Sequence, residues 1–341
     1  MKISFDPTWS IAQIGEKKLI ETVLRPLFAP PDGDEIIGDD CAALSVPEGA
    51  LALLSTDRVP ADLMAYKAGL LDARGLGRYL ALLNLSDIAA CGGLPLALLF
   101  NCALPANFSL HALVDIATGM RDLTAQFGAI VAGGDLSSSV EISLSATAFG
   151  YVEKELRLPR RGASPDDTIF VTRPPGLTTV GLRYCKSPSD FDWLSLQEVD
   201  RLRNQFSCLE PEFEIGRTLA ASGHCTSCMD NTDGVGQSLS ELAAESRSAF
   251  VVRVDELPLD PLVVRSAEKS DEDPIALALG PGADFGLIGT LAGKWDQERA
   301  RTLHPRIVPV GSVAEGQGVH LSRDGTDEPF SPRGWEYFSS G

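Results

Sequence analysis

The sequence is organised around the string Asn-Leu-Ser-Asp-Ile-Ala-Ala at residues 84–90. This string closes the segment 73–91, in which leucines recur at steps of three and four residues, a spacing that predicts an amphipathic helix. Asn84 and Asp87 are three residues apart, so both side chains can lie on one helix face and meet one ligand. The Gly-Gly-Leu-Pro string at residues 92–95 then ends the helix.

Three further aspartate clusters lie where apolar runs of the first half break. They are Gly-Asp-Asp at residues 38–40, Ser-Thr-Asp at residues 55–57 and Gly-Gly-Asp at residues 133–135. A single aspartate at such a place is commonly a helix cap or a turn former. Several together, beside glycine or small hydroxyl residues that let backbone N–H groups approach phosphate, favour a phosphate site. Their oxygen ligands suit Mg²⁺, which would also relieve the repulsion between them.

The composition describes a chain large enough for two domains and too acidic to favour a nucleic-acid partner. Its 341 residues are 44% hydrophobic and can bury a large core. The net charge of -18 argues against binding a nucleic-acid backbone or an anionic membrane. No run approaches the roughly 18 apolar residues of a membrane span, and residues 1–6 lack a signal-peptide core. The seven cysteines have no disulfide-framework spacing, so we expect a reducing, cytoplasmic compartment.

One cysteine pair has the spacing of a metal or redox motif. Cys225 and Cys228 form a Cys-x-x-Cys string, but no second pair completes a zinc site and no redox helix start follows. Structural cysteines on a buried strand are the favoured interpretation.

The periodicity of the first half predicts an α/β domain. A helix is expected at residues 10–28 and a buried strand at 50–54, which would deliver the Ser-Thr-Asp string at its end. A second strand, 129–132, would likewise end in Gly-Gly-Asp. Further elements are expected at 96–104 (strand), 109–127 (helix) and 140–148 (strand with one polar face).

The second half repeats this logic after a segment rich in Pro, Gly and charge at residues 158–167, the expected domain boundary. Strands are predicted at 168–171 and 250–254 and helices at 212–222 and near 235–246. The turn at 229–234 opens the second of these helices, and a Gly-rich turn at 280–286 precedes another apolar segment. The polar tail after about residue 320 is expected to be loosely ordered.

Missing motifs narrow the chemistry. The sequence has no Gly-x-x-x-x-Gly-Lys-[Ser/Thr] loop, no protein-kinase catalytic loop and no Gly-x-Gly-x-x-Gly after a strand. Its four histidines are scattered, so a Ser-His-Asp assignment would be arbitrary. Phosphoryl transfer needs mainly positioning and charge neutralisation, and carboxylates with a metal can supply both.

The order of the motifs resembles the thiamine-monophosphate kinase branch of the aminoimidazole-ribonucleotide-synthetase-like ATP-binding superfamily. The resemblance runs from about Glu16 to Leu287, and its most specific part is the string at 84–90 with its flanking aspartate motifs. Weaker matches follow at residues 160–163, 229–234 and 282–285.

The resemblance implies a two-domain α/β (α+β) protein that binds ATP and Mg²⁺. Residues 1–152 would form the ATP- and Mg²⁺-binding dimerisation domain, whose strands join a β-barrel across a homodimer. Residues 153–341 would form a mixed α/β domain. The γ-phosphoryl group of ATP would then pass directly to a small-molecule acceptor.

The resemblance also assigns roles by position. Asp135 and Asp233 would be catalytic. Thr56, Asn84, Gly133, Gly134 and Arg160 would contact the nucleotide, with Arg161 replacing the serine of the family's Arg-Ser-Gly-Ala string. The metal-binding carboxylates would be Asp39, Asp40, Asp57, Asp87, Asp135 and Asp233.

The sequence departs from the family on the acceptor side. The family string Val-Glu-Gly-Val-His-Phe corresponds here to Pro-Ala-Asp-Leu-Met-Ala at 60–65. Gly-Gly-Glu-Asp-Tyr-Glu becomes Pro-Gly-Ala-Asp-Phe-Gly at 281–286, which loses both glutamates and a hydroxyl, and Asp-Ile-Ser-Asp-Gly becomes Asp-Asn-Thr-Asp-Gly at 230–234. A cationic thiazolium ring would miss its carboxylates and its aromatic wall.

We therefore expect an Mg²⁺-dependent, ATP-using phosphotransferase whose small-molecule acceptor is not thiamine monophosphate. Two alternatives stay open: ATP-dependent activation of an amide or carboxyl oxygen, as in a synthetase, and a degenerate nucleotide-binding dimer without turnover. The retained aspartates favour activity, because drift would erode a self-repelling cluster. Neither a nucleic acid nor a membrane is an expected partner.

Overall fold

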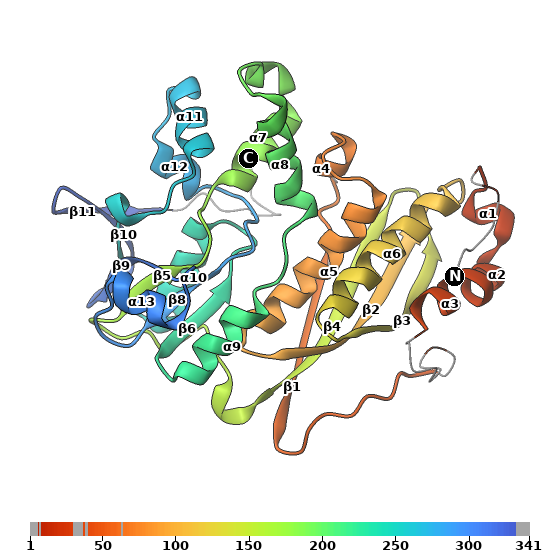
Figure 1. The fold of residues 1–341 in the computed structure, drawn as a ribbon, viewed down its shortest axis with the longest axis horizontal. Helices are drawn as coiled ribbons and strands as arrows, with labels where there is room; N and C mark the ends of the chain where they lie inside the picture. Colours follow the sequence, from red (N-terminus) through yellow and green to blue (C-terminus); the bar gives the residue numbers. More distant parts are fainter. Residues whose placement is uncertain (1–5, 7, 30–36, 38–39, 63, 332–341) are drawn as a thin grey trace. The chain divides into compact units, whose positions relative to one another are not determined.

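The computed structural model describes residues 6, 8–29, 37, 40–62 and 64–331 (Figure 1). The chain divides into two compact units, which we describe separately. The first comprises Met1–Ile88, Leu94–Val152 and Phe206–Glu210, and the second comprises Ala89–Gly93, Glu153–Gln205 and Pro211–Gly341. The exchanged segments, 89–93 and 206–210, depart from a simple division between residues 152 and 153.

The first unit is a four-stranded sheet with two long helices on one face (Figure 1). The strand order is β1-β4-β2-β3, with β2 parallel to β3 and antiparallel to β4. The strands are β1 (Ala50–Arg58), β2 (Leu94–Leu104), β3 (Ile130–Ser138) and β4 (Ser143–Glu153). The helices on the sheet are α5 (Ala73–Ala90) and α6 (Leu110–Gln126), which confirm the helices predicted at 73–91 and 109–127.

Two strands of this sheet are longer than the sequence predicted. The strings 55–57 and 133–135 lie inside β1 and β3 and not beyond their ends. β1 is an edge strand whose residues alternate between more and less exposed positions, so the prediction of a buried strand there was wrong. The apolar run marked only part of the strand, because half of its positions face away from the helices.

The expected single helix at residues 10–28 is broken into short pieces. These are α1 (Ile11–Ile14), α2 (Glu16–Leu19), the π-helix η1 (Ile20–Leu24) and α3 (Arg25–Phe28). Gly15 has φ of 77°, outside the helical region, which separates α1 from α2. The pieces η1 and α3 pack against α6.

Helices α5 and α6 cross with their backbones in contact. A Cβ atom on Gly77 would lie 1.8 Å from the carbonyl oxygen of Ile116, and one on Gly119 would lie 1.9 Å from that of Arg74. Two glycines, one on each helix, therefore permit an approach that no larger residue allows.

The second unit is a seven-stranded mixed sheet of order β11-β10-β7-β9-β5-β8-β6. β5 and β6 are both antiparallel to β8, which lies between them. The strands are β5 (Thr168–Val171), β6 (Cys225–Asp230), β7 (Ala249–Arg253), β8 (Leu287–Leu291), β9 (Val308–Ala314), β10 (Gly318–Arg323) and β11 (Thr326–Phe330).

Both faces of this sheet are covered by helices, and β5 shows how the cores divide. Ile169 and Val171 join the core beneath α10 (Val235–Ser246). Phe170 points the other way, into a core shared with α9 (Phe213–Ser222) and α13 (Gln297–Leu303). The continuous apolar string at 168–171 thus reads as a strand buried on both faces.

A third, helical core in the second unit includes Val180, Leu202 and Val263. It is formed by α7 (Leu177–Lys186), α8 (Leu196–Ser207), α11 (Pro261–Ser270) and α12 (Pro274–Ala278). The remaining short elements are α4 (Met64–Lys67) and the 3₁₀ turns η2 (Lys154–Leu156), η3 (Pro188–Phe191) and η4 (Val254–Glu256).

The expectation of a loosely ordered tail from about residue 320 was wrong as far as Phe330. β10 pairs in parallel with β7, and β11 returns antiparallel to β10 at the sheet edge. These strands are polar because one edge and part of both faces meet solvent. Among the described residues, no helix is long and apolar enough to span a membrane.

We predict that Gly77→Ala lowers the free energy of unfolding by at least about 1–3 kcal/mol, because its new methyl group meets a backbone carbonyl. In an exposed helix the same change would stabilise by roughly 0.5–1 kcal/mol. Urea denaturation measures the difference. Gly75→Ala on the same helix is the control, since its Cβ would first meet the flexible end of Leu71 at 2.8 Å. Equal stabilities of the two variants would contradict the backbone contact.

Candidate active site

The strings at 55–57 and 84–90 are joined by hydrogen bonds between β1 and α5. The Ser55 hydroxyl donates to the Asp87 carboxylate. The Asn84 amide oxygen accepts from the Asp57 N–H at 3.0 Å, and its amide nitrogen donates to the Leu80 carbonyl at 2.9 Å. Two aspartates from motifs about thirty residues apart are thereby positioned from the same strand–helix junction.

Asn84 is fully buried, with 0% of its surface exposed, and both ends of its amide are used inside the protein. This geometry gives Asn84 a positioning role at the junction. Its predicted contact with the nucleotide stays a prediction.

Thr56 lies on the face of β1 turned away from α5. Its hydroxyl donates to the Ala146 carbonyl at 2.9 Å and accepts from the Thr147 hydroxyl at 3.2 Å, both on the neighbouring strand β4. Thr147 is in turn the register partner of Leu99 on β2. These residues mark the helix-free face of the sheet.

The Gly-Gly-Asp string lines an apolar hollow on the first unit. Gly133, Gly134 and Asp135 share this hollow of about 90 Å³ with side chains from the N-terminal helices and from β2. A Cβ on Gly134 would lie 1.8 Å from the Phe100 carbonyl oxygen, so this position requires glycine. Cys102 also lines the hollow, and burial raises the pKa of its thiol to about 12, which keeps it neutral.

The structure does not gather all the predicted carboxylates within the first unit. Asp135 lies on β3, at the sheet edge opposite β1, and is paired in register with Asn101 on β2. Three strand spacings, roughly 14 Å, separate the two edge strands. Asp40 is exposed, and Asp39 lies outside the described residues. In the described part of the chain, no three His, Cys, Asp or Glu side chains form a group that could hold a metal.

The remaining predicted residues belong to the second unit. Arg160 is exposed and forms an ion pair with Glu241 of α10 at 3.2 Å. Asp233 is exposed in the turn between β6 and α10. Cys228 is buried on β6, whereas Cys225 on the same strand is only partly buried, and the described cysteines form no disulfide.

The predicted donor set fits Mg²⁺ in its chemistry. All predicted ligands offer carboxylate oxygens, which Mg²⁺ prefers. In addition, the Asn231 amide oxygen, beside Asp233 in the same turn, is buried without a hydrogen-bond partner among the described residues. A buried acceptor in this state is unusual and fits a site completed by a bound cation or its water.

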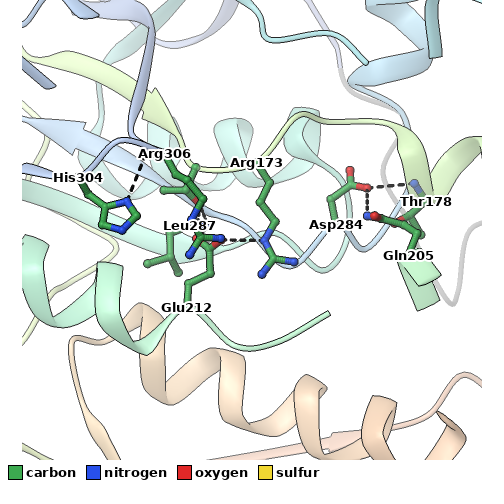
Figure 2. Close-up of polar contacts among 9 residues, drawn as sticks. Arg173, Thr178, Gln205, Glu212, Asp284, Leu287, His304 and Arg306 are labelled. Atoms are coloured by element: carbon green, nitrogen blue, oxygen red, sulfur yellow. Dashed lines mark hydrogen bonds and ion pairs between the residues drawn. The ribbon is translucent and has the colours of Figure 1, made fainter. Parts of the chain in front are cut away.

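Sequence reasoning missed a buried ion cluster in the second unit, which we call the Glu212 cluster (Figure 2). One Glu212 oxygen accepts from Arg173 at 2.7 Å and from Arg306 at 2.8 Å. The other accepts from the Thr172 hydroxyl and from the Leu287 N–H at 3.3 Å. No local signal could have found this cluster, because its members come from four separate segments.

Asp284, the aspartate of the string at 281–286, holds the start of α7. Its carboxylate accepts from the backbone N–H groups of Gly176 at 2.8 Å and Thr178 at 3.0 Å, and from the Gln205 side chain at 3.3 Å (Figure 2). Burial raises the pKa of Asp284 against the lowering effect of these hydrogen bonds. This aspartate therefore has a structural task in the second unit.

Comparison with known proteins first defines the class. Residues 38–152 match the family model described as AIR synthase related protein, N-terminal domain. This segment includes the β1–α5 junction and the Gly-Gly-Asp string at 133–135. The chain thus has an AIR synthase-like fold.

Individual relatives identify one family within this class. The thiamine-monophosphate kinase of Nitrosopumilus maritimus (strain SCM1) is 30% identical over 260 residues, 74% of this chain and 79% of the relative. That of Pyrococcus horikoshii is 26% identical over 332 residues, 95% and 98% of the two chains. The solved structure of AaThiL complexed with AMPPCP and TMP is 25% identical with a TM-score of 0.73, covering 98% of this chain and 100% of that one.

The chain belongs to the thiamine-monophosphate kinase family, and it is an ATP-dependent kinase. The resemblance inferred from the order of the motifs is confirmed.

Asn84→Ala should lower the free energy of unfolding by about 1–3 kcal/mol, because the Asp57 N–H and the Leu80 carbonyl both lose their partner. Urea denaturation provides the measurement, and Asn101→Ala, at an exposed position of β2, provides the control. A loss no larger than that of the control would show that the junction does not depend on the Asn84 amide.

Proposed function

We propose that the chain transfers the γ-phosphoryl group of MgATP directly and in line to a small-molecule acceptor. The observation that carries the proposal is the junction at which the Ser55 hydroxyl donates to the Asp87 carboxylate and the Asn84 amide oxygen accepts from the Asp57 N–H. Phosphoryl transfer depends on positioning and charge neutralisation, and aspartates on a strand and a helix that are hydrogen-bonded to each other can supply both by binding metal ions.

In this proposal Asp39, Asp40, Asp57, Asp87, Asp135 and Asp233 hold Mg²⁺, with Asp135 and Asp233 closest to the chemistry. Mg²⁺ held by these carboxylates would neutralise the negative charge that develops on the phosphate oxygens. Gly133 and Gly134 would let backbone N–H groups approach the phosphates. Thr56 and Arg160 would make further nucleotide contacts, and the apolar hollow beside Asp135 would receive an apolar part of the nucleotide.

We also propose that the active form is a homodimer whose first-unit sheets join into a β-barrel. Two features support it. The helix-free face carries apolar side chains in solvent, among them Leu54 at 72% and Leu99 at 41% exposure. In addition, Asp135 on β3 and Asp57 on β1 lie on opposite edge strands of one sheet, so a second copy offers a way to bring such carboxylates together.

We propose further that the acceptor is not thiamine monophosphate. The relatives' names point to thiamine monophosphate, and the comparisons give no support to a different acceptor. Residues 60–65 and 281–286 support a changed acceptor, because the family's glutamates, histidine and aromatic positions are missing there. In the structure Met64–Lys67 forms the short helix α4, and Phe285 stands where the family string has tyrosine.

We predict that Asp87→Asn and Asp135→Asn each lower ADP release by at least about 100-fold, because a charge that positions Mg²⁺ is lost. The free energy of unfolding should change by less than about 1 kcal/mol. Thermal unfolding with ATP plus Mg²⁺, against ATP plus chelator, gives a second readout, since stabilisation of the wild type should require the metal. Asp115→Asn, a partly exposed position on α6, is the control. Full activity of both test variants would refute the metal assignment.

For the acceptor, we expect ADP release with thiamine monophosphate to be far below that of a committed thiamine-monophosphate kinase assayed in parallel. The reason is the loss of carboxylates that would face a cationic ring. Product analysis separates the two reaction types: a kinase yields a phosphorylated acceptor, whereas a synthetase-type reaction releases inorganic phosphate as a nitrogen nucleophile attacks. Equal turnover of thiamine monophosphate by the two enzymes would contradict the proposal of a changed acceptor.

A further inference from the structure

A pocket of about 440 Å³ lies in the helical part of the second unit and contains none of the residues assigned to the candidate active site. We call it the Trp193 pocket. Its walls come from the ends of α7 and α11, from η3 and from the segments that follow these elements. The volume falls within the range of roughly 300–1,000 Å³ that is typical of small-molecule sites.

The ends of α7 and α11 present polar faces to the Trp193 pocket. Arg183 and Lys186 are three residues apart on α7, and Ser266 and Lys269 are three residues apart on α11. Residues at this spacing lie on one face of a helix. The two helices also share the helical core of the unit. Two packed helices, and not mobile loops, therefore hold the basic side chains of the pocket.

Phe191 and Trp193 form an aromatic wall that is fixed in place. Their ring centroids are 5.7 Å apart, and the Trp193 indole N–H donates to the Asp190 carbonyl at 3.1 Å. The Arg265 guanidinium carbon lies 4.7 Å from the centroid of the Trp193 ring, and Arg265 pairs with Glu198 at 2.5 Å. Arg265 does not line the pocket, so it supports the ring from outside. Both aromatic residues remain partly exposed.

The charged side chains of the Trp193 pocket comprise one ion pair and three groups outside it. Arg183 donates two hydrogen bonds of 2.8 Å to Glu272 and holds the pKa of that carboxyl below its usual value, so the two charges cancel. Lys186 and Lys269 form no hydrogen bond or ion pair with the described part of the chain. With the exposed Asp190, the lining carries a net charge of +1.

Charged neighbours that do not line the pocket change this sum. Glu268 and Asp271 lie next to the pocket residues and are exposed, and counting them gives -1. Adjacent residues of a helix do not face each other, so Glu268 and Lys269 point in different directions. Charges in solvent are also screened. Selection of a ligand thus depends on the two ammonium groups that line the pocket and not on its net charge.

We propose that the Trp193 pocket binds a small aromatic anion. Its ring would stack on Trp193 and Phe191, since aromatic rings favour offset or edge-to-face contacts with one another. Its phosphate or carboxylate group would pair with Lys186 and Lys269, whose ammonium groups act as compact charges. A protein partner would need about 800 Å² of contact area per side, far more than the lining provides. This inference does not depend on the proposed function.

The alternative is that the lysines only interact with the carbonyl ends of their helices, which attract cations without any ligand. Five probes distinguish the two explanations. Phenyl phosphate and benzoate combine a ring with an anion, inorganic phosphate has the anion alone, benzyl alcohol has the ring alone, and benzylamine combines a ring with a cation. Each is titrated into the whole chain by calorimetry, at constant ionic strength and without Mg²⁺ or ATP.

We expect phenyl phosphate or benzoate to bind the wild type more tightly than the other three probes, and the tighter of the two identifies the anionic group. Lys186→Ala and Lys269→Ala should each weaken that binding by at least about fivefold, because a charge-assisted hydrogen bond is lost. Lys294→Ala is the matched control, since Lys294 is an exposed lysine of the same unit outside the pocket.

Tryptophan fluorescence reports where the ring binds. The aromatic anion should quench the wild type, whereas Trp193→Phe should keep most of the affinity and lose that quenching, because a ring remains but the fluorophore is removed. Trp193→Ala should weaken binding by at least about fivefold, because the stacking partner is lost.

The proposal would be overturned by equal affinities of the wild type and both lysine variants, or by quenching that persists in Trp193→Phe. Binding of inorganic phosphate, benzyl alcohol or benzylamine as tightly as the aromatic anions would overturn it too, as would a complete lack of binding by phenyl phosphate and benzoate. Failure of Mg²⁺-dependent ATP binding would contradict the proposed function alone.

Discussion

The buried amide of Asn84 is the interaction on which the first unit's site depends. It is hydrogen-bonded at one end to the backbone of β1 and at the other to the backbone of its own helix. Without it, the Asp57 N–H would face an apolar interior with no acceptor, a state that costs free energy comparable to a lost hydrogen bond. The position of one carboxylate-bearing strand is thus specified from inside the core, where solvent cannot compete.

The carboxylates of the two units differ in how many hydrogen-bond partners they have inside the protein. In the second unit, Glu212 and Asp284 are neutralised in place by guanidinium groups, a hydroxyl and backbone N–H groups, so they stabilise the fold around them. In the first unit, Asp87 meets only a serine hydroxyl among the contacts described above. The Asp87 carboxylate is therefore less committed to the fold than Glu212 and Asp284 are, which fits the metal-binding role proposed for it.

Much of the fold could be predicted from local pattern. The helix at 73–91 and the strand at 168–171 could be predicted from their apolar residues. The helix buries one apolar stripe, and the strand is buried on both faces. The ends of β1 and β3 could not be placed, since their polar residues alternate onto a face without helices. The strands near the C-terminal end were missed because they are held by pairing with β7 and with each other, and not by apolar content.

The candidate site, like the fold, could be predicted from the sequence only in part. Motif order identified the family and the aspartates at 55–57 and 84–90, whose strand and helix are adjacent in the fold. It could not show that Asn84 is a buried support, because burial depends on partners distant in the chain. The Glu212 cluster was beyond reach for the same reason, since Thr172, Arg173, Glu212 and Arg306 meet only after the sheet and its helices have packed.

The close approach of α5 and α6 at Gly77 and Gly119 has a consequence for motion. Two helices whose backbones touch cannot slide or rotate past each other without a steric collision, so we expect α5 and α6 to move as one rigid body. Residues 84–90 lie at the C-terminal end of α5 and would move with it. Any closure of the enzyme on its nucleotide must then be taken up by segments outside this helix pair, and the β1–α5 junction would travel as a unit, with its aspartates in unchanged register.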